Sequence, residues 1–106
     1  MTELNLTPPE QCATLEEIRS GMDAIDRRII ALLASRVEHV KAAAKFKTTA
    51  DSVAAPDRVQ KVLDTRRDWA AAAGLDGDVV RGLYRDIVTY CVGEEKKHWE
   101  QSQKQS

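Results

Sequence analysis

The chain has 106 residues, of which 42% are hydrophobic and 31% charged, and its formal net charge is −1. These values are typical of a single soluble globular domain and exclude multi-domain schemes. The five aromatic residues are not arranged for base stacking and no basic stripe is present, so no nucleic-acid partner is expected. The polar start and the lack of a long apolar run predict a cytoplasmic protein that does not contact membranes.

The first expected helix covers residues 15–47. Residues 1–13 carry Pro8 and Pro9 and show no periodicity, so we expect a flexible arm there and a helical domain over residues 14–106. Thr14 and Glu17 have the spacing of a capping box, which predicts a helix start. Alternating steps of three and four place on one face Leu15, Ile18, Met22, Ile25, Ile29, Leu32, Arg36, His39, Ala43 and Lys47.

Arg36 and Lys47 stand at positions of this stripe where the pattern requires core side chains. A buried cation is costly unless an anion meets it, and the stripe offers few acids, so we expect an anionic small molecule to bind here. The two residues are eleven positions apart, which is close to three helical turns, so we expect them to hold one ligand from one face. Arg19 is rotated from that face by about 100° and is expected to serve a different pocket, such as the partner's.

The remaining chain predicts two more helices. Side chains in residues 48–55 compete with helical hydrogen bonds, which predicts a loop. Pro56 suits the first turn of a second, short helix, which Gly74 would end. Val59, Val62, Leu63, Arg66 and Trp69 follow helical spacing along it.

Asp76 can cap a third helix, which we expect to fray in the polar tail over residues 101–106. The expected buried face of this helix comprises Val80, Leu83, Tyr84, Ile87, Cys91, Glu95 and Trp99, with Glu94 as the alternative to Glu95. A carboxyl among apolar neighbours resists ionisation, and a protonated glutamate could donate a hydrogen bond to a substrate oxygen.

These lengths predict an all-α fold of three helices, long, short and long, in an intertwined homodimer. The first helix would be about 50 Å long, which is more than the short second helix can cover. Apolar stripes of that size mark interfaces, and a two-fold dimer is the commonest solution.

Neither a metal site nor a cofactor site is expected. Cys12 and Cys91 lack metal-ligand spacing and are predicted to be free thiols, and His39 and His98 are too far apart in sequence to form a ligand motif. The glycines are scattered and form no phosphate-binding loop.

An ordered set of short stretches carries a family resemblance over nearly the whole chain. They are C-x-x-L-x-x-I-R ending at Arg19, M-D-A-I-D from Met22, R-x-x-x-V-K-A-A from Arg36, the F-K pair at Lys47, A-P-D-R-V from Ala55, W-A-x-x-x-G-L-D from Trp69, and the late E-x-K-x-x-W. The chain resembles the all-α chorismate mutase family, and within it the isochorismate-pyruvate lyases most.

The resemblance implies roles for particular residues. Arg36 and Lys47 would bind the substrate's carboxylates and ether oxygen, and Arg19 would reach in from the other subunit of a homodimer. Arg58 falls on the family's second-helix arginine. Glu95 falls where the lyases and many mutases have glutamine, although some mutases carry a glutamate there that must be protonated. Lys47, Glu95 and Arg36 are therefore the expected catalytic residues.

Val59 and Cys91 complete the expected substrate-binding set. Bacterial mutases that resemble this chain often have a carboxylate directly after the second-helix arginine, and here that residue is Val59. This difference favours the lyase, whereas Glu95 favours the mutase.

The resemblance implies a cofactor-free pericyclic enzyme that converts isochorismate to salicylate and pyruvate, with chorismate mutase activity (chorismate to prephenate). One alternative is a dedicated chorismate mutase of aromatic amino-acid biosynthesis. Another is a non-catalytic helical dimerisation or regulatory module, which would tolerate Arg36→Leu. Arginines outside the expected site are predicted to lie on the surface: Arg28, Arg66, Arg67, Arg81 and Arg85.

Overall fold

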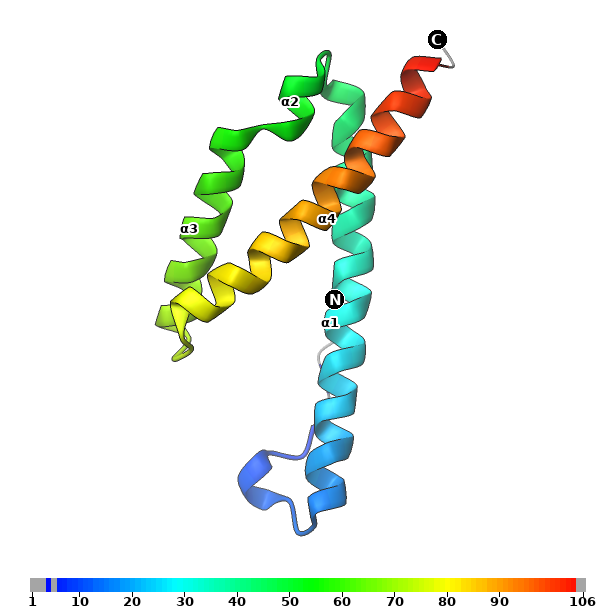
Figure 1. Ribbon diagram of the computed structural model, residues 1–106. Coiled ribbons are helices and arrows are strands. Elements are labelled where there is room, and N and C mark those ends of the chain that lie inside the picture. The colour runs from blue at the N-terminus through cyan, green and yellow to red at the C-terminus, as the bar shows by residue number, and fades with distance from the viewer. Residues whose placement is uncertain (1–3, 5, 105–106) are drawn as a thin grey trace. The chain divides into compact units, whose positions relative to one another are not determined.

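The computed structural model describes residue 4 and residues 6–104, and this part of the chain contains helices and no strands (Figure 1). The elements in chain order are η1 Pro9–Gln11, α1 Leu15–Ala43, η2 Ala44–Phe46, α2 Ala50–Ala54, α3 Pro56–Ala72 and α4 Gly77–Lys104. The predicted all-α fold with one long, one short and one further long helix is confirmed, and α2 is an addition. The chain divides into two compact units, residues 1–36 and residues 37–106, and each is described by itself.

Helix α1 begins at the predicted capping box. The Glu17 amide donates to Thr14 Oγ1 at 3.1 Å, and Glu17 Oε2 accepts from the Ala13 amide at 3.1 Å. The Glu17 carboxylate therefore accepts from Ala13, the residue before the N-cap Thr14, and not from Thr14 itself. Thr14 thereby satisfies one amide that a helix start leaves without a partner, and Glu17 satisfies the amide of the residue before the cap.

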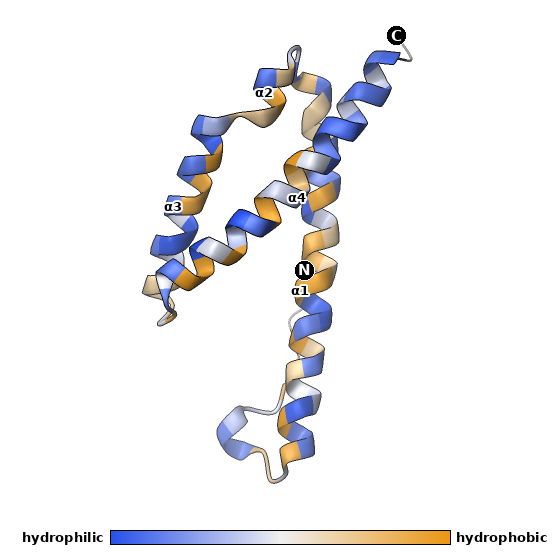
Figure 2. Cartoon of the chain, in the orientation of Figure 1, coloured by the Kyte–Doolittle hydropathy of each residue, from blue (hydrophilic) through white to orange (hydrophobic). Residues whose placement is uncertain are grey.

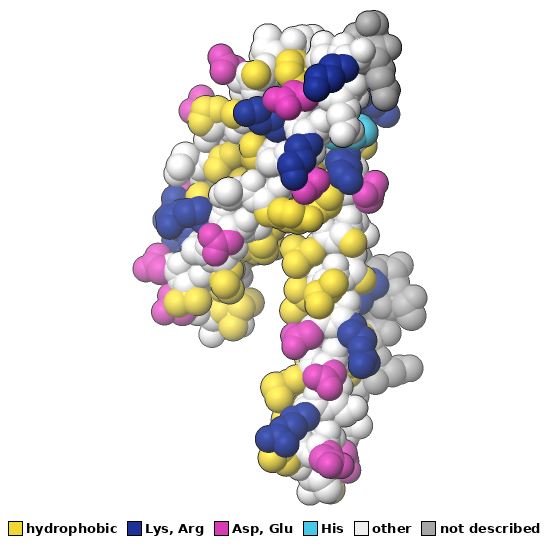
Figure 3. All heavy atoms as spheres, turned by 45° about the vertical axis from the view of Figure 1, so that its right-hand side comes forward, with side chains coloured by type: hydrophobic (Ala, Val, Ile, Leu, Met, Phe, Trp, Pro, Cys, Tyr) yellow, Lys and Arg dark blue, Asp and Glu magenta, His cyan; other side chains and the backbone are white. Residues whose placement is uncertain are grey.

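The apolar stripe of α1 is exposed in a single chain. None of the 29 residues of this helix is buried, and Leu15, Met22 and Ile29 are 59%, 51% and 49% exposed. Figure 3 shows apolar side chains at the surface among the charged ones. Residues 1–36 by themselves therefore leave the stripe uncovered.

The predicted end of the first helix is wrong. Helix α1 ends at Ala43, the 3-10 turn η2 follows, and Lys47 is extended with φ −101° and ψ 134°. The eleven-residue helical spacing between Arg36 and Lys47 therefore does not describe their geometry.

The cause lies just beyond Lys47, where residues 48–55 contain α2 instead of the predicted loop. Thr49 accepts the Ser52 amide on its side chain at 3.1 Å, and the Thr49 amide donates to Ser52 Oγ at 3.3 Å. This capping box requires Thr49 to be extended, so the chain must leave the first helix before it. The threonines compete with α1 as predicted, but they also start a new helix.

The signals around α3 and α4 act as predicted. Pro56 opens α3, and Gly74 follows its end with φ 85° while the Leu75 amide donates to the Ala70 carbonyl at 2.9 Å. Asp76 Oδ1 accepts the amides of Asp78 and Val79 at 3.1 and 3.3 Å. Helix α4 continues to Lys104 instead of fraying from residue 101, and residues 105–106 lie outside the described residues.

Helices α3 and α4 pack on each other around Val62, Leu63 and Val88, with Val59, Tyr84 and Val92 packed against this core. Figure 2 shows apolar positions interspersed with polar ones along both helices. Leu83 of the predicted buried face is 58% exposed in the single chain, and Trp69 is 61% exposed. Val88 is a core residue outside the predicted face, although it lies one helical turn before Cys91.

Four of the five arginines predicted to lie on the surface are half-buried, namely Arg28, Arg66, Arg67 and Arg81. Arg66 and Arg81 lie where α3 contacts α4. The Arg66 guanidinium lies 4.4 Å from the Trp69 ring centroid and 5.9 Å from that of Tyr84. Arg81 on α4 contacts Asp64 Oδ1 and Gln60 Oε1 of α3, each at 3.2 Å. Their apolar stems cover the helix contact while their charged ends find partners.

Candidate active site

The site in residues 37–106 is built around Lys47 and Glu95. The Lys47 Nζ atom lies 3.2 Å from Glu95 Oε1, and the Lys47 and Glu95 side chains are 26% and 7% exposed. Glu95 is the buried charged residue among those described, at 5% exposure, because α4 carries it on the same face as Val88 and Cys91. Helical periodicity correctly predicted that Glu95 is the more buried of the two glutamates: the Glu94 side chain is 25% exposed and pairs with Lys97 at 3.6 Å.

Two further groups hold Lys47. Its Nζ donates to the Ser52 carbonyl at 2.9 Å, and its own carbonyl accepts from Trp99 Nε1 at 3.0 Å. Lys47 is thus bonded at its backbone and at its ammonium, and it remains partly open to an incoming anion.

Ser52 and Trp99 have roles here that the sequence did not predict. Ser52 contributes a backbone carbonyl, which residue identity does not reveal. Trp99 stands four residues after Glu95, so helical spacing indicates a shared face. That spacing predicts burial, but it does not indicate which backbone group the indole meets.

The remaining predicted residues of this unit lie near the same helices. Cys91 is 2% exposed and precedes Glu95 by one turn of α4. Val59 on α3 is half-buried against the core, while Arg58 beside it is exposed. Both cysteines are free thiols, as predicted.

Arg19 and Arg36 belong to the unit of residues 1–36. Arg19 is exposed and Arg36 is half-buried on α1. The convergence of these arginines with Lys47 on one ligand stays a prediction.

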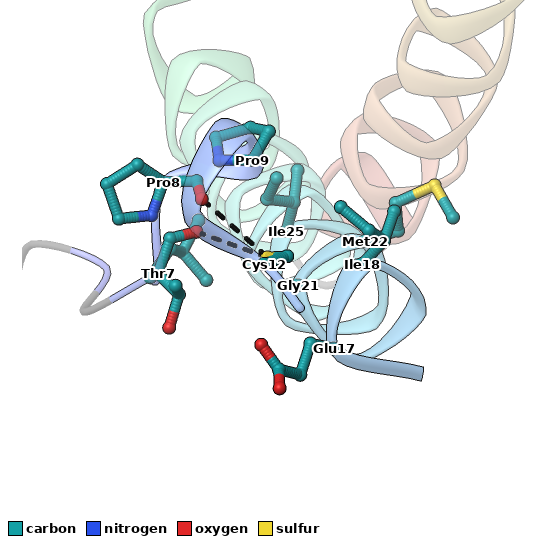
Figure 4. Close-up of a pocket in the computed structure, with 10 residues that line it drawn as sticks. Thr7, Pro8, Pro9, Cys12, Glu17, Ile18, Gly21, Met22 and Ile25 are labelled. Atoms are coloured by element: carbon teal, nitrogen blue, oxygen red, sulfur yellow. Dashed lines mark hydrogen bonds between the residues drawn. The ribbon is translucent and has the colours of Figure 1, made fainter. Parts of the chain in front are cut away.

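Residues 1–36 also form a pocket of about 150 Å³ between the N-terminal segment and α1 (Figure 4). Apolar groups such as Ile18, Met22 and Ile25 line it, together with Glu17. The Cys12 thiol donates to the Thr7 and Pro8 carbonyls at 4.0 and 3.7 Å. No predicted cation lines this pocket, so its chemistry does not suit a dicarboxylate.

A shallow pocket in residues 37–106 lies between α2, α3 and α4. Val59, Val88 and Val92 line it, with Gln60 and Thr89 among the polar residues. Its lining is mostly apolar and contains Val59 of the predicted substrate-binding set.

In the described part of the chain, no helix is both long enough and apolar enough to cross a membrane.

Comparisons with known proteins agree with the resemblance seen in the sequence. An isochorismate pyruvate lyase of Pseudomonas aeruginosa is 39% identical over 94 residues, which cover 89% of this chain and 93% of the relative. A T-protein of Haemophilus influenzae is 35% identical over 72 residues, 67% of this chain but 19% of that protein. Residues 18–96 match the family described as chorismate mutase type II. A match of that extent, together with the identity to the lyase, shows that this chain is a member of the chorismate mutase type II family.

Proposed function

We propose that this chain is an isochorismate-pyruvate lyase that also has chorismate mutase activity. The observation that carries the proposal is the 39% identity, over 89% of this chain and 93% of the relative, to a protein named isochorismate pyruvate lyase. We also propose that the protein is cytoplasmic.

The lyase reaction needs neither a cofactor nor a protein nucleophile. In one step the ether C–O bond of isochorismate breaks while a ring hydrogen moves to the enolpyruvyl methylene, which yields salicylate and pyruvate. The protein can accelerate this step by holding a compact conformer and by placing a cation where negative charge grows on the ether oxygen. Lys47 suits that role, because the Ser52 carbonyl and Glu95 hold its ammonium at 2.9 and 3.2 Å.

Arg36 and Arg58 would bind the substrate's carboxylates, with Glu95 donating a hydrogen bond in its protonated form. Val59 and Cys91 would contribute the surrounding apolar wall. Val59 is half-buried and Cys91 is buried, which supports this assignment.

A dedicated chorismate mutase is the second candidate. Glu95 favours it, because some mutases of the family carry glutamate at this position. Val59 favours the lyase, since it offers no carboxylate to accept a hydrogen bond from the chorismate hydroxyl.

We also propose a two-fold homodimer in which Arg19 enters the partner's site. The support is the exposed stripe of α1, where Leu15, Met22, Ile25, Ile29 and Leu32 are 39% to 59% exposed. Burying such side chains stabilises an assembly by about 25 cal/mol per Å² of apolar surface removed from water.

The deciding experiment incubates the purified protein with isochorismate and, separately, with chorismate at acidic and at neutral pH. Salicylate is followed by its fluorescence, and prephenate is followed after conversion to phenylpyruvate. Salicylate formation is the expected result. Prephenate alone would assign the chain to the dedicated mutases, and turnover of neither compound would favour the non-catalytic module.

Arg36→Leu tests whether the charge on α1 serves catalysis. We expect the variant to remain dimeric and to lose about 100-fold or more in kcat/KM, because it lacks a cation that binds a substrate carboxylate. Arg27→Leu is the matched control, since Arg27 is exposed and nine residues earlier, on the opposite face of α1. An unchanged rate in Arg36→Leu would reject the site and favour an adaptor.

A further inference from the structure

We propose that Trp99 is a positioning residue, which acts on the reaction by holding the backbone of Lys47. The inference rests on the proposed function, because Lys47 is catalytic only if that function is correct. Trp99 lies 52 residues away in sequence, and its Nε1 atom donates to the Lys47 carbonyl at 3.0 Å in a partly buried bond.

The bond matters because Lys47 lies outside any helix. It follows η2, has φ −101° and ψ 134°, and precedes the extended cap of α2. Inside a helix the amide four residues later would donate to this carbonyl, but here the chain has left helical geometry. The indole therefore supplies the donor for a carbonyl that would otherwise need another partner or water.

Helix α4 contacts Lys47 at two places one turn apart. Trp99 bonds its carbonyl, and Glu95 lies 3.2 Å from its Nζ. Four residues of an α-helix span about 6 Å, which is comparable to the reach of an extended lysine side chain. One rigid helix thus aligns the lysine along its length, and the Ser52 carbonyl fixes the direction of the ammonium from α2.

Loss of the indole donor should affect catalysis more than binding. The lysine is assigned to the oxygen on which charge grows, and an interaction that strengthens in the transition state contributes mainly to kcat. The substrate's carboxylates are assigned to arginines that Trp99 does not contact in the proposed arrangement.

Trp99→Phe is the decisive variant, because it keeps an aromatic ring and removes the N–H donor. We expect kcat to fall about tenfold to a hundredfold, as for a small misplacement of a catalytic group, while KM changes less than about threefold. Trp69→Phe is the matched control: Trp69 is 61% exposed on α3 and should leave kcat within about twofold.

A double-variant cycle separates positioning from general loss of structure. In a Lys47→Met background, Trp99→Phe should lower the residual rate by less than about twofold, because the group that it positions is gone. A structural role would lower the rate by the same factor in both backgrounds, and that outcome would overturn the proposal. An unchanged kcat in Trp99→Phe alone would overturn it as well, while leaving the proposed function intact.

Hydrogen exchange of the two indole N–H groups, followed by NMR, needs no substrate and no variant. We expect the Trp99 indole proton to exchange at least about tenfold more slowly than that of Trp69. Equal exchange rates would overturn the proposal even if Trp99→Phe fails to fold. If the unmodified protein turns over neither substrate, the catalytic role is rejected together with the proposed function, whereas slow exchange would still establish the bond.

Discussion

At Glu95 a single side chain combines burial, charge and a titratable proton. The residue is 5% exposed and lies 3.2 Å from the Lys47 ammonium. An ionised carboxylate accepts hydrogen bonds only, whereas its protonated form can also donate one. A hydrogen bond donated by Glu95 to the substrate therefore requires the protonated form.

Glu95→Gln tests this dependence on a proton. The amide can donate a hydrogen bond without binding a proton, so we expect the variant to retain its kcat/KM at neutral pH or to exceed that of the unmodified protein.

The check is a comparison of kcat/KM for both proteins at neutral pH. Glu94→Gln is the matched control, because Glu94 is half-buried, pairs with Lys97, and should leave kcat/KM unchanged. Loss of activity in the Glu95→Gln variant at neutral pH would contradict the role of the proton.

Among the elements, the contact between α3 and α4 determines where α4 places Glu95 and Trp99. Helix α4 starts at Gly77, where a Cβ atom would lie 2.8 Å from the Arg67 carbonyl oxygen and 2.9 Å from Arg67 Cγ. The Cγ atom belongs to a flexible side chain, but the carbonyl belongs to the backbone of α3. A side chain at this position therefore forces the two helices apart.

Gly77→Ala should lower the free energy of unfolding by about 1–3 kcal/mol, the usual cost of overpacking. The same substitution at Gly82 should raise it by about 0.5–1 kcal/mol, because nothing lies within 4 Å of a Cβ there and alanine favours the helix. Denaturant unfolding at equal protein concentration measures both effects. A Gly77→Ala protein as stable as the Gly82→Ala protein would contradict the close approach.

On the scale of the whole molecule, the buried apolar residues among those that the structure describes are few, and none lies in α1. They are Ala44, Val53, Val62, Leu63, Ala70, Val88 and Cys91. The apolar stripe of α1 is therefore available to a second copy, and a two-fold dimer would bury the same stripe on both chains.

Ile29→Asp should weaken dimerisation by about tenfold or more, since burial of an unpaired carboxylate is costly. Ala31→Asp introduces the same charge on the opposite face of α1, where Ala31 is exposed, and should leave the dimer intact. Light scattering coupled to size-exclusion chromatography distinguishes the mass of the monomer from that of the dimer. A monomeric unmodified protein, or equal behaviour of both variants, would reject the proposed interface.

Much of the fold follows from local signals. The cap at Thr14, the helix start at Pro56, the stop at Gly74 and the cap at Asp76 each act within a few residues, and all four occur as predicted. The burial of Glu95 also follows from helical periodicity, because its face of α4 includes Cys91.

The sequence by itself determined the helical fold, the family and the identity of the charged candidates, because periodicity, caps and motifs are properties of short stretches. Only the tertiary structure decided how Lys47 is held. Its backbone is extended because the cap of α2 follows it. Its carbonyl accepts a hydrogen bond from Trp99, and its ammonium donates one to Glu95. The two bonds from α4 join residues about fifty positions apart in sequence. The pattern of neighbouring residues does not indicate which distant side chain will donate to a backbone carbonyl, such as that of Lys47, that lies outside a helix.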